Sequence, residues 1–383
     1  MFILDKPYVS DFLQNTAIKY GYPVLNNKSV QELDLDEELN FICEGAAINR
    51  IKEGAETLLY SNSENAIDWI SKNLDFTEIP EKINLFKDKV KFRKLISEIY
   101  HDFYFREIDL DEIQKIKTDE IPYPVVLKPS IGFLSFGVYT IYNAEDWKDT
   151  VKNLKSDIEK FKSVFPNSVV DASKFIIEKL IEGKEFAADV YFNRQGEPVI
   201  LNIFHHPFVS KDDVSDRVYF TSKKIIETHL DNFTNLFKKI AKSADLKNFP
   251  AHIELRADDD GNITPIEVNP MRFAGWCISD LAHFSYGVNV YEYYFEQYVP
   301  DWKKILENTD NSIYYFVVAE NPSKFNKNNV IDYEEFLKNI KNPLDIRKID
   351  PKTHPVFAIV FAKTDTMDEI YDILKLDFNK FVK

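Results

Sequence analysis

The residues with the clearest chemistry in this chain lie in one segment, 252–272, which reads HIELRADDDGNITPIEVNPMR. Its centre, Asp260-Gly261, separates two alternating stretches, and such a pair predicts a β-hairpin with a two-residue type I′ turn. Strands that continue from this turn set Glu254 directly opposite Glu267. Two carboxylates that face each other across a strand pair repel unless a cation neutralises them. The segment therefore predicts either a cation site or a solvated polar edge.

The same pairing adds polar partners to that face of the hairpin. His252 falls opposite Asn269, on the side that carries both glutamates, because side chains alternate along a strand. The other side carries residues typical of a core: Ile253, Leu255, Ala257, Thr264, Ile266 and Val268. Two carboxylates and an amide oxygen are hard ligands that suit Mg²⁺ shared with phosphate groups. The candidate metal ligands are Glu254, Glu267 and Asn269.

A second feature is a glycine-framed loop, 132–137 (GFLSFG), which follows Lys128-Pro129. The chain has only ten glycines, so two of them around one loop are informative. Glycines let backbone N–H groups approach and cradle a phosphate, and Lys128 at the end of a strand would add charge for the same anion. No GxxxxGK[ST] or GxGxxG motif occurs. The alternative is a hairpin with glycines at its turn.

Three further segments carry weaker signals. Residues 178–185 (EKLIEGKE) predict a strand, a tight corner and a second strand, where free backbone groups would read an adenine and Glu185 a ribose. Lys89 and Arg93 place cations on one helical face, and His205-His206 offers a candidate general base. The alternatives are a charged turn, a solvated face and structural histidines.

Composition limits the class of protein. At 383 residues the chain predicts two or three subdomains. A net charge of −15 argues against a nucleic-acid-binding surface. The two cysteines, Cys43 and Cys277, suggest neither a disulfide framework nor a zinc site. The amino terminus lacks the pattern of a signal peptide and no run is long enough to span a membrane, so a cytoplasmic setting is expected.

Hydrophobic periodicity and turn residues divide the chain into alternating elements. A small α/β domain is expected up to Pro80. The predicted strands lie at 2–5, 22–25, 174–192, 197–208, 312–319, 344–349 and 356–363, with two more around the glycine loop. The predicted helices lie at 10–20, 36–54, 63–73, 84–100, 144–163, 222–244, 332–340 and 366–381.

Taken in this order and spacing, the segments over roughly residues 1–300 resemble the ATP-grasp superfamily. The resemblance implies an α/β (α+β) ATP-grasp fold with an amino-terminal α/β (pre-ATP-grasp) domain. It places that domain at 1–80, a subdomain with the phosphate loop at 81–172, and one with the adenine hinge and metal hairpin at 173–301. Residues 302–383 form an extra carboxy-terminal α+β element, expected to be a lid, a dimer element or a substrate cover.

The resemblance also assigns roles to individual residues. It implies that ATP is bound by Lys89, Lys128, Ser135, Phe136, Glu178, Lys179, Ile181 and Glu185, the last of these at the ribose. It implies Mg²⁺, with Mn²⁺ as an alternative, on Glu254, Glu267 and Asn269, and catalytic roles for Lys128 and Arg272. Two departures stand out. His252 replaces the arginine of D-alanine–D-alanine ligases, and Arg272 after the E-x-N resembles the carboxylase and amino-acid-ligase branches instead.

The activity implied is that of a carboxylate–amine ligase. ATP would convert a carboxylate into an acyl phosphate, and an amine would displace phosphate to form an amide or peptide-type bond, releasing ADP and phosphate. The alternatives are an ATP-grasp carboxylase, a small-molecule kinase, and a non-catalytic nucleotide-binding protein. The expected partners are ATP and small-molecule carboxylate and amine substrates, without nucleic acid or membrane. A homodimer is one expected assembly, and residues 203–221 are expected to border the substrate site.

Overall fold

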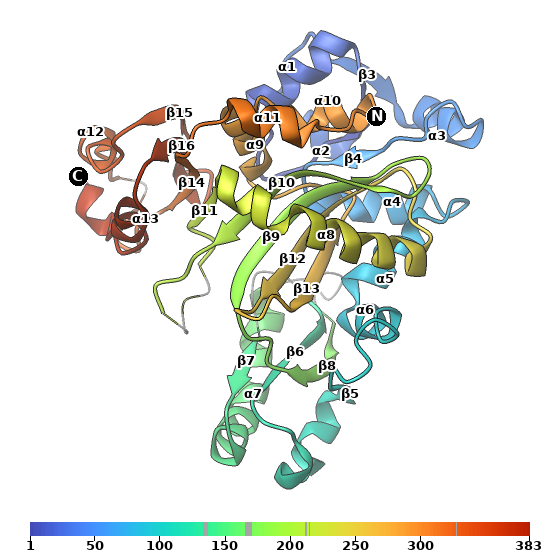
Figure 1. Ribbon diagram of the computed structural model, residues 1–383, viewed down its shortest axis with the longest axis vertical. Coiled ribbons are helices and arrows are strands. Elements are labelled where there is room, and N and C mark those ends of the chain that lie inside the picture. The colour runs from blue at the N-terminus through green and yellow to red at the C-terminus, as the bar shows by residue number, and fades with distance from the viewer. Residues whose placement is uncertain (133–136, 165–170, 211–212, 214, 327) are drawn as a thin grey trace.

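The computed structural model describes the chain except for residues 133–136, 165–170, 211, 212, 214 and 327. In the described part the strands form three sheets: two four-stranded sheets and one eight-stranded sheet. Figure 1 shows the amino-terminal sheet at the top and the second four-stranded sheet at the bottom. The large sheet begins between them and continues to its carboxy-terminal strands at the upper left. Within these residues no helix is both long and apolar enough to cross a membrane.

The amino-terminal domain is a parallel sheet in the order β3-β2-β1-β4. Its strands are β1 (Phe2–Ile3), β2 (Pro23–Asn26), β3 (Asn40–Cys43) and β4 (Tyr60–Ser61). Its helices are α1 (Asp11–Tyr20), α2 (Lys28–Gln31), α3 (Glu44–Lys52), η1 (Glu64–Ala66) and α4 (Ile67–Asn73). The α/β alternation is confirmed, but the helix predicted at 36–54 is wrong in its first half, because 40–43 is a half-exposed edge strand that runs directly into α3.

The helix predicted at 84–100 is also wrong as a single element. It consists of α5 (Ile79–Lys87) and α6 (Lys89–Leu95), separated at Asp88. Asp88 has extended backbone angles, and its carboxylate accepts hydrogen bonds from the amides of Val90 and Lys91. A side-chain acceptor that satisfies the first free N–H groups starts a new helix. This break places Lys89 in the first turn of α6.

The second four-stranded sheet is antiparallel in the order β5-β8-β6-β7. Its elements are β5 (Phe105–Asp109), η2 (Leu110–Lys115), η3 (Thr118–Glu120), β6 (Val125–Ile131), β7 (Tyr139–Ile141), α7 (Ala144–Val164) and β8 (Asp171–Lys179). Its core includes Val125, Leu127, Trp147 and Phe175, each at most 3% exposed. The sequence did not predict β5, whose residues alternate poorly and carry several charges.

The large sheet runs β13-β12-β9-β10-β11-β14-β16-β15 and is antiparallel throughout its described pairings. Its strands are β9 (Lys184–Phe192), β10 (Pro198–His206), β11 (Val218–Thr221), β12 (Phe249–Ala257), β13 (Ile263–Pro270), β14 (Ile313–Glu320), β15 (Pro343–Lys348) and β16 (Val356–Thr364). The helices that lie between its strands along the chain are α8 (Lys223–Ala244), between β11 and β12, and η4 (Ile278–Asp280), α9 (Leu281–Tyr286), α10 (Val290–Phe295) and α11 (Trp302–Asn308), between β13 and β14.

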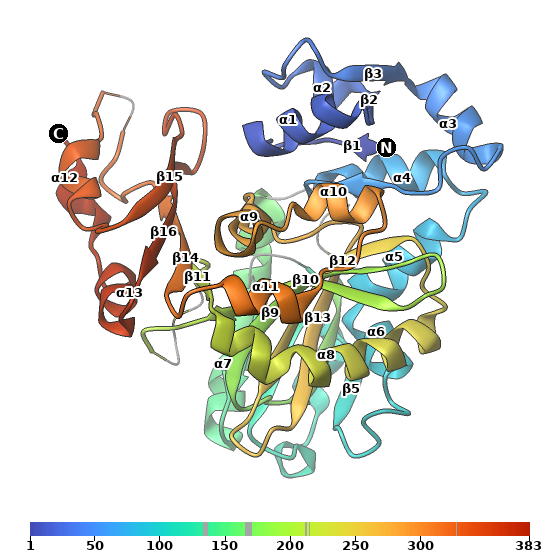
Figure 2. The ribbon, with the colours of Figure 1, turned by 45° about the horizontal axis from the view of Figure 1, so that its top comes forward.

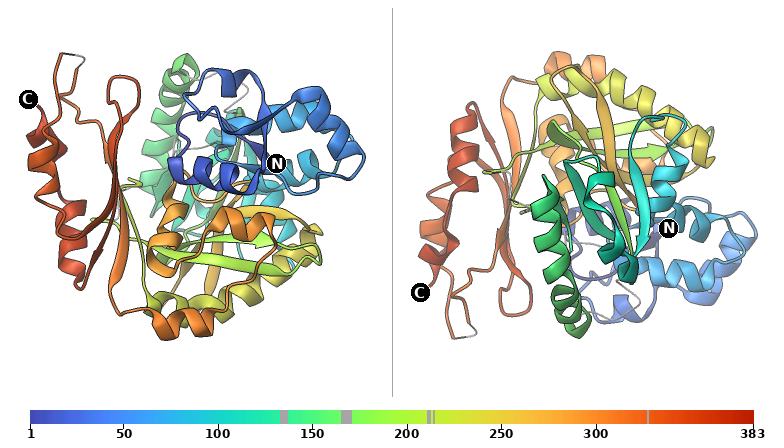
Figure 3. Two further views of the ribbon diagram at one scale, coloured as in Figure 1. Left: turned by 90° about the horizontal axis from the view of Figure 1, so that it is seen from above. Right: turned by 90° about the horizontal axis from the view of Figure 1, so that it is seen from below.

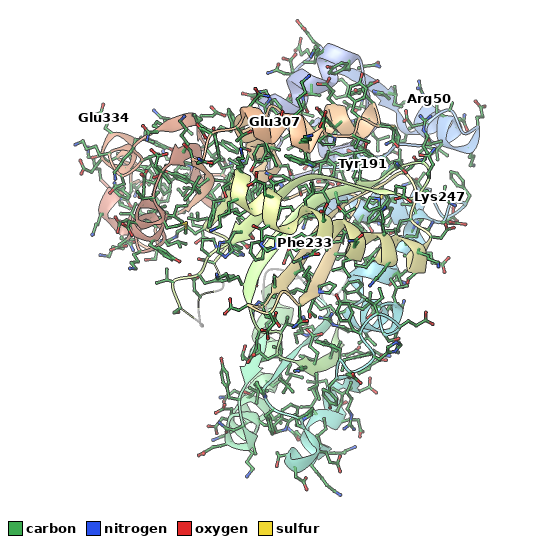
Figure 4. All side chains as sticks on the ribbon, viewed as in Figure 1. Arg50, Tyr191, Phe233, Lys247, Glu307 and Glu334 are labelled. Atoms are coloured by element: carbon green, nitrogen blue, oxygen red, sulfur yellow. The ribbon has the colours of Figure 1, made fainter. Side chains whose placement is uncertain are left out.

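Helix α8 lies across the large sheet and buries one apolar stripe against it (Figure 1). Phe233 on that stripe is fully buried, as is Tyr191 on β9, whereas Lys247 lies at the surface (Figure 4). Residues recurring at helical spacing on one face predict this arrangement. The helix begins at the Ser222 cap, whose side chain accepts from the amide of Ile225. It agrees with the helix predicted at 222–244.

The carboxy-terminal tail continues the large sheet because β14 pairs with β11. Its helices are α12 (Tyr333–Leu337), α13 (Met367–Leu374) and η5 (Phe378–Phe381), so the helix predicted at 366–381 is interrupted. Helices α12 and α13 cover the outer face of the tail strands (Figures 2 and 3). Residues of η4 and α9 pack against the other face. The tail strands are therefore a covered extension of the central sheet.

Candidate functional site

The hairpin of β12 and β13 has the predicted register at its functional end. Glu254 lies opposite Glu267, and His252 lies opposite Asn269. The two-residue turn is wrong, because the loop extends from Asp258 to Asn262. The Asp258 carboxylate accepts hydrogen bonds from the Asp260 and Asn262 amides, which holds this wider loop in place.

A β-bulge compensates for the wider loop. The register shifts between Glu254 and Leu255, so Leu255 pairs with Pro265 and Ile266 has no partner across the hairpin. The extra residue restores the pairing of the two glutamates. It also turns Ile266 toward the cavity described below, so the prediction that Ile266 is a core residue is wrong.

The three candidate metal ligands lie together. Asn269 Nδ2 is 3.0 Å from Glu254 Oε1 and 3.5 Å from Glu267 Oε1. Burial and the charge of Glu267 raise the pKa of Glu254 well above its ordinary value. Burial opposes the ionised form of Glu267 as well. The positive charges of Lys89, Lys87 and Lys128 nevertheless bring the pKa of Glu267 down to about 2. Two adjacent carboxylates, one of which resists ionisation, fit a site for a divalent cation.

This set contains two carboxylates and one amide. Over the described residues, no group of three or more His, Cys, Asp or Glu side chains is placed to hold a metal ion. The fit to Mg²⁺ therefore depends on the amide oxygen of Asn269 and on oxygens from a ligand. Mg²⁺ is commonly held by one or two carboxylates together with phosphate oxygens, so the donor set suits a metal that arrives with a phosphate.

Lysine 89 connects the hairpin to the glycine loop. Its Nζ lies 3.1 Å from Glu267 Oε2 and donates to the carbonyl of Gly132 at 3.3 Å. Ser135 and Phe136, predicted to cover phosphates, lie outside the described residues. The beginning of the loop is thus next to the predicted metal ligands.

Lysine 128 belongs to a buried ion cluster at the end of the second sheet. Its Nζ is 2.6 Å from Glu178 Oε1, and Arg93 Nε is 2.6 Å from Glu178 Oε2. All three residues are at most 5% exposed. Burial opposes ionisation of Glu178, but Arg93 and Lys128 outweigh it and lower the pKa of Glu178 to about 2. Arg93, predicted only as part of a basic helical face, is one of the largest fully buried side chains among the described residues.

The predicted adenine hinge is the corner between β8 and β9. The amide of Lys179 donates to the Tyr104 carbonyl, and that of Leu180 donates to the Pro124 carbonyl. Gly183 has φ +107°, and a Cβ there would lie 2.4 Å from the Ala257 carbonyl oxygen. Only glycine permits this approach, so the corner lies directly against the end of β12.

Glutamate 185, the predicted ribose ligand, has two protein partners. Arg256 donates to its Oε2 from Nε at 3.1 Å and from Nη2 at 2.9 Å. His206 Nδ1 lies 3.3 Å from its Oε1. His206 therefore contacts the predicted ribose site, whereas His205 on the same strand stacks against Phe186.

Arginine 272 and His252 occupy the other end of the hairpin. Arg272 Nη2 is 3.0 Å from Glu64 Oε1, and its Nε has no hydrogen-bond partner in the part of the chain that is described. His252 Nδ1 is 2.8 Å from Asp189 Oδ1, and its Nε2 is 3.9 Å from Glu254 Oε1. A buried carboxylate thus orients His252 beside a predicted metal ligand.

A cavity of about 860 Å³ joins these elements. Its wall includes most of the predicted binding residues: Lys89, Lys128, Glu178, Ile181, Glu185, Glu254 and Glu267. Ligand pockets of this size hold small molecules and cofactors. Tyr371 of α13 also lines the cavity, so the carboxy-terminal tail reaches it.

Sequence reasoning missed four residues of this site. Glu64, Arg93, Asp189 and Arg256 contact predicted site residues but were not themselves predicted to be site residues. Arg93 was predicted only as part of a basic helical face, and Arg256 only as part of the hairpin segment. Asp189 could have been found, because it is the lone carboxylate in the otherwise apolar stretch FAADVYF at residues 186–192. The other three lie in charged, amphipathic surroundings where sequence offers no distinguishing signal.

Comparisons with known proteins bear on the family and the fold of this chain. Residues 121–280 match the family model of the ATP-grasp domain. A D-alanine–D-alanine ligase from Borreliella burgdorferi (strain ZS7) is 23% identical over 335 residues, covering 78% of this chain and 82% of that protein.

Two solved structures have a similar fold. An L-amino acid ligase from Bacillus licheniformis matches with a TM-score of 0.66 and 15% identity, covering 100% of this chain and 97% of that one. A biotin carboxylase from Campylobacter jejuni matches with a TM-score of 0.65 and 14% identity, covering 100% and 92%. At these identities the likeness establishes the fold.

Proposed function

We propose that this chain, which carries an ATP-grasp domain at residues 121–280, is an ATP-dependent ligase that joins a carboxylate to an amine. The observation that supports this most strongly is the distribution of charge around the cavity. Lys89 and Lys128 lie on its wall together with the facing carboxylates Glu254 and Glu267. A triphosphate needs cations for its oxygens, and paired carboxylates need a divalent cation, so one ligand with its metal satisfies both.

Phosphoryl transfer depends on positioning and charge neutralisation, and different residues of the site would perform each of these. Lys89 and Lys128 would neutralise phosphate oxygens, and the hinge at Lys179 and Ile181 would bind the adenine. Glu254, Glu267 and Asn269 would hold Mg²⁺, which would offset the negative charge of the β- and γ-phosphates.

The reaction would proceed through an acyl phosphate. The substrate carboxylate attacks the γ-phosphorus of ATP and ADP leaves. The amine then attacks the acyl carbon, phosphate leaves, and the nitrogen releases a proton as the amide bond forms. Arg272 is the candidate to stabilise the transferred phosphoryl group, since its half-buried guanidinium has a buried Nε without a hydrogen-bond partner among the described residues. It would turn from Glu64 toward that group.

The proposal is tested by measuring phosphate release from Mg-ATP against pairs of carboxylic acids and amines. A ligase releases phosphate only when both substrates are present. A stable phosphorylated product from the acid alone would indicate a kinase, and a requirement for bicarbonate would indicate a carboxylase. Absence of turnover with retained ATP binding would indicate a non-catalytic nucleotide-binding protein.

The Glu267→Gln variant tests the site assignment in the same assay. Removal of one carboxylate from a metal-binding pair is expected to lower turnover about 100-fold or more. Glu227→Gln on the exposed side of α8 is the matched control and should retain wild-type activity. Unchanged turnover in Glu267→Gln would contradict the assignment.

A further inference from the structure

Arginine 256 holds together the two parts of the predicted nucleoside site. Its Nη1 donates to the Ile181 carbonyl at 2.8 Å, and its Nε and Nη2 donate to Glu185 Oε2 at 3.1 and 2.9 Å. The guanidinium lines the cavity, and its side chain is 29% exposed. One side chain thus binds the hinge backbone and the ribose carboxylate at once.

The sheet positions this arginine for both contacts. Arg256 pairs with Glu185 across β12 and β9, so their side chains emerge side by side on one face. The next residue of β12, Ala257, is the one against which Gly183 packs. The end of β12 therefore contacts the hinge through a backbone approach and through the arginine fork. A guanidinium donates in a fixed planar geometry, so the hinge and the carboxylate are held in one relative position.

We infer that Arg256 is a positioning residue that limits how Glu185 binds the ribose. With Arg256 in place, Glu185 can accept a hydrogen bond from only one ribose hydroxyl. The inference rests on the proposed function, in which the ligand is a purine nucleoside triphosphate. It concerns nucleotide selection and leaves the reaction itself unchanged.

The acceptor capacity of Glu185 carries the inference. A carboxylate offers about four lone-pair sites. Arg256 uses both sites of Oε2, and His206 Nδ1 lies 3.3 Å from Oε1. His206 Nε2 lies 3.0 Å from the Ser215 carbonyl, so the imidazole is held between this carbonyl and Glu185 and fills the space at one of the two Oε1 sites. About one site on Oε1 then remains for a ligand.

The consequence is an unequal response to the two ribose hydroxyls. The hydroxyl that reaches Oε1 makes a charge-assisted hydrogen bond, and its removal should weaken binding about 10- to 100-fold. Removal of the other hydroxyl should change affinity less than about threefold, because it meets no free carboxylate site. Without Arg256, Oε2 becomes available and both hydroxyls can find an acceptor.

The experiment measures dissociation constants of ATP, 2′-deoxyATP and 3′-deoxyATP by titration calorimetry with Mg²⁺. For the wild type, the constants of the two deoxy analogues should differ about tenfold or more. For Arg256→Ala that ratio should fall to within about threefold of unity, while ATP itself binds more weakly because the hinge loses a contact. Arg256→Lys keeps a cation beside Oε2 without the fork, and its ratio should lie between these values.

Arg106→Ala on the exposed side of β5 is the matched control and should retain the wild-type ratio. An arginine that serves only folding would change melting temperature and all three affinities together, leaving the ratio unaltered. Equal binding of both analogues by the wild type, or a wild-type ratio in Arg256→Ala, would overturn the inference while ATP binding supports the proposed function. Failure of the wild type to bind Mg-ATP would refute the proposed function, and the inference with it.

Discussion

Replacing Glu178 with glutamine tests whether the buried ion cluster holds the second sheet together. Glu178 accepts from Arg93 Nε and Lys128 Nζ, both at 2.6 Å, and is 2% exposed. Glutamine has nearly the same shape but no charge. The buried side chains of Arg93 and Lys128 would then lose the carboxylate that both of them contact. The variant is therefore expected to be much less stable than the wild type.

The pKa of Glu178 gives the magnitude. Burial opposes its ionisation, but Arg93 and Lys128 bring the pKa from 4.5 to about 2. This depression corresponds to roughly 3 kcal/mol of stability at neutral pH. Burial also lowers the pKa of Lys128. The whole cluster therefore stabilises the fold by less than the pKa of Glu178 alone indicates. Removal of one partner of a buried pair nevertheless costs about 3–5 kcal/mol, and we expect a loss of about 3 kcal/mol.

The pH dependence has a defined sign. The folded-state pKa of Glu178 is below its unfolded value, so the stabilisation is complete above about pH 4.5 and is lost as the pH falls toward about 2. The glutamine variant lacks this group and should show a shallower loss of stability across that range. The difference between the two proteins should therefore shrink as the solution is acidified.

Hydrogen exchange of the β6 and β8 amides is the suitable assay, because a protein with three sheets need not unfold in one step. At pH 7 these amides should exchange about 100-fold faster in Glu178→Gln. Glu120→Gln removes an exposed ion pair with Lys117 (3.7 Å). In this control the free energy of opening obtained from the exchange rates should change by less than about 1 kcal/mol. Wild-type protection in Glu178→Gln at pH 7 would refute the reasoning.

Two other substitutions test the hinge and the tail. Gly183→Ala should weaken ATP binding about tenfold or more, measured by calorimetry, because its Cβ would overlap the Ala257 carbonyl at 2.4 Å; Gly261→Ala, also at positive φ but with open space around it, should bind ATP as the wild type does. Arg347→Met should leave buried Asp280 without its 2.6 Å partner and destabilise the contact between β15 and η4 by about 3–5 kcal/mol. Limited proteolysis should then cleave the tail faster, and an unchanged rate would contradict this account.

The functional end of the hairpin was predictable because strand alternation fixes which residues share a face. The register of Glu254 and Glu267 depended on the predicted turn, and that turn is wrong. The predicted pairing of the two glutamates is nevertheless correct, because the bulge at Ile266 compensates for the wider loop. The bulge could not be predicted, since Asp258 stabilises the loop through contacts to later backbone amides. Asp-Gly sequences are compatible with both loops.

The elements were predicted where apolar periodicity was strong and missed where boundaries depend on side-chain hydrogen bonds. Helix α8 follows its apolar stripe, so the predicted range agrees closely with Lys223–Ala244. The break between α5 and α6 depends on a single cap at Asp88, within an otherwise continuous helical pattern. Strand β3 has four residues and two exposed ends, too short for a period to identify it.

The site residues that the sequence did not predict are the protein partners of residues that it did predict. Glu64 precedes Arg272 by more than two hundred residues, and the pair forms only because η1 and the end of β13 meet in the fold. Arg256 is one of eight arginines in the chain, and its partner is known only once the β9–β12 register places it beside Glu185. Motif spacing identifies the groups that contact a ligand, whereas the tertiary structure determines what holds them.

The pairing of charges bears on how the site would receive its nucleotide. Lys89 is paired with Glu267, and Arg272 is paired with Glu64. A phosphate that recruits Lys89 leaves Glu267 beside Glu254 without its cation, and two adjacent carboxylates in a partly buried site repel strongly. A nucleotide that brings a divalent cation supplies new partners for both the lysine and the carboxylates. Under the proposed function, therefore, these two ion pairs disfavour the binding of metal-free ATP and favour that of Mg-ATP.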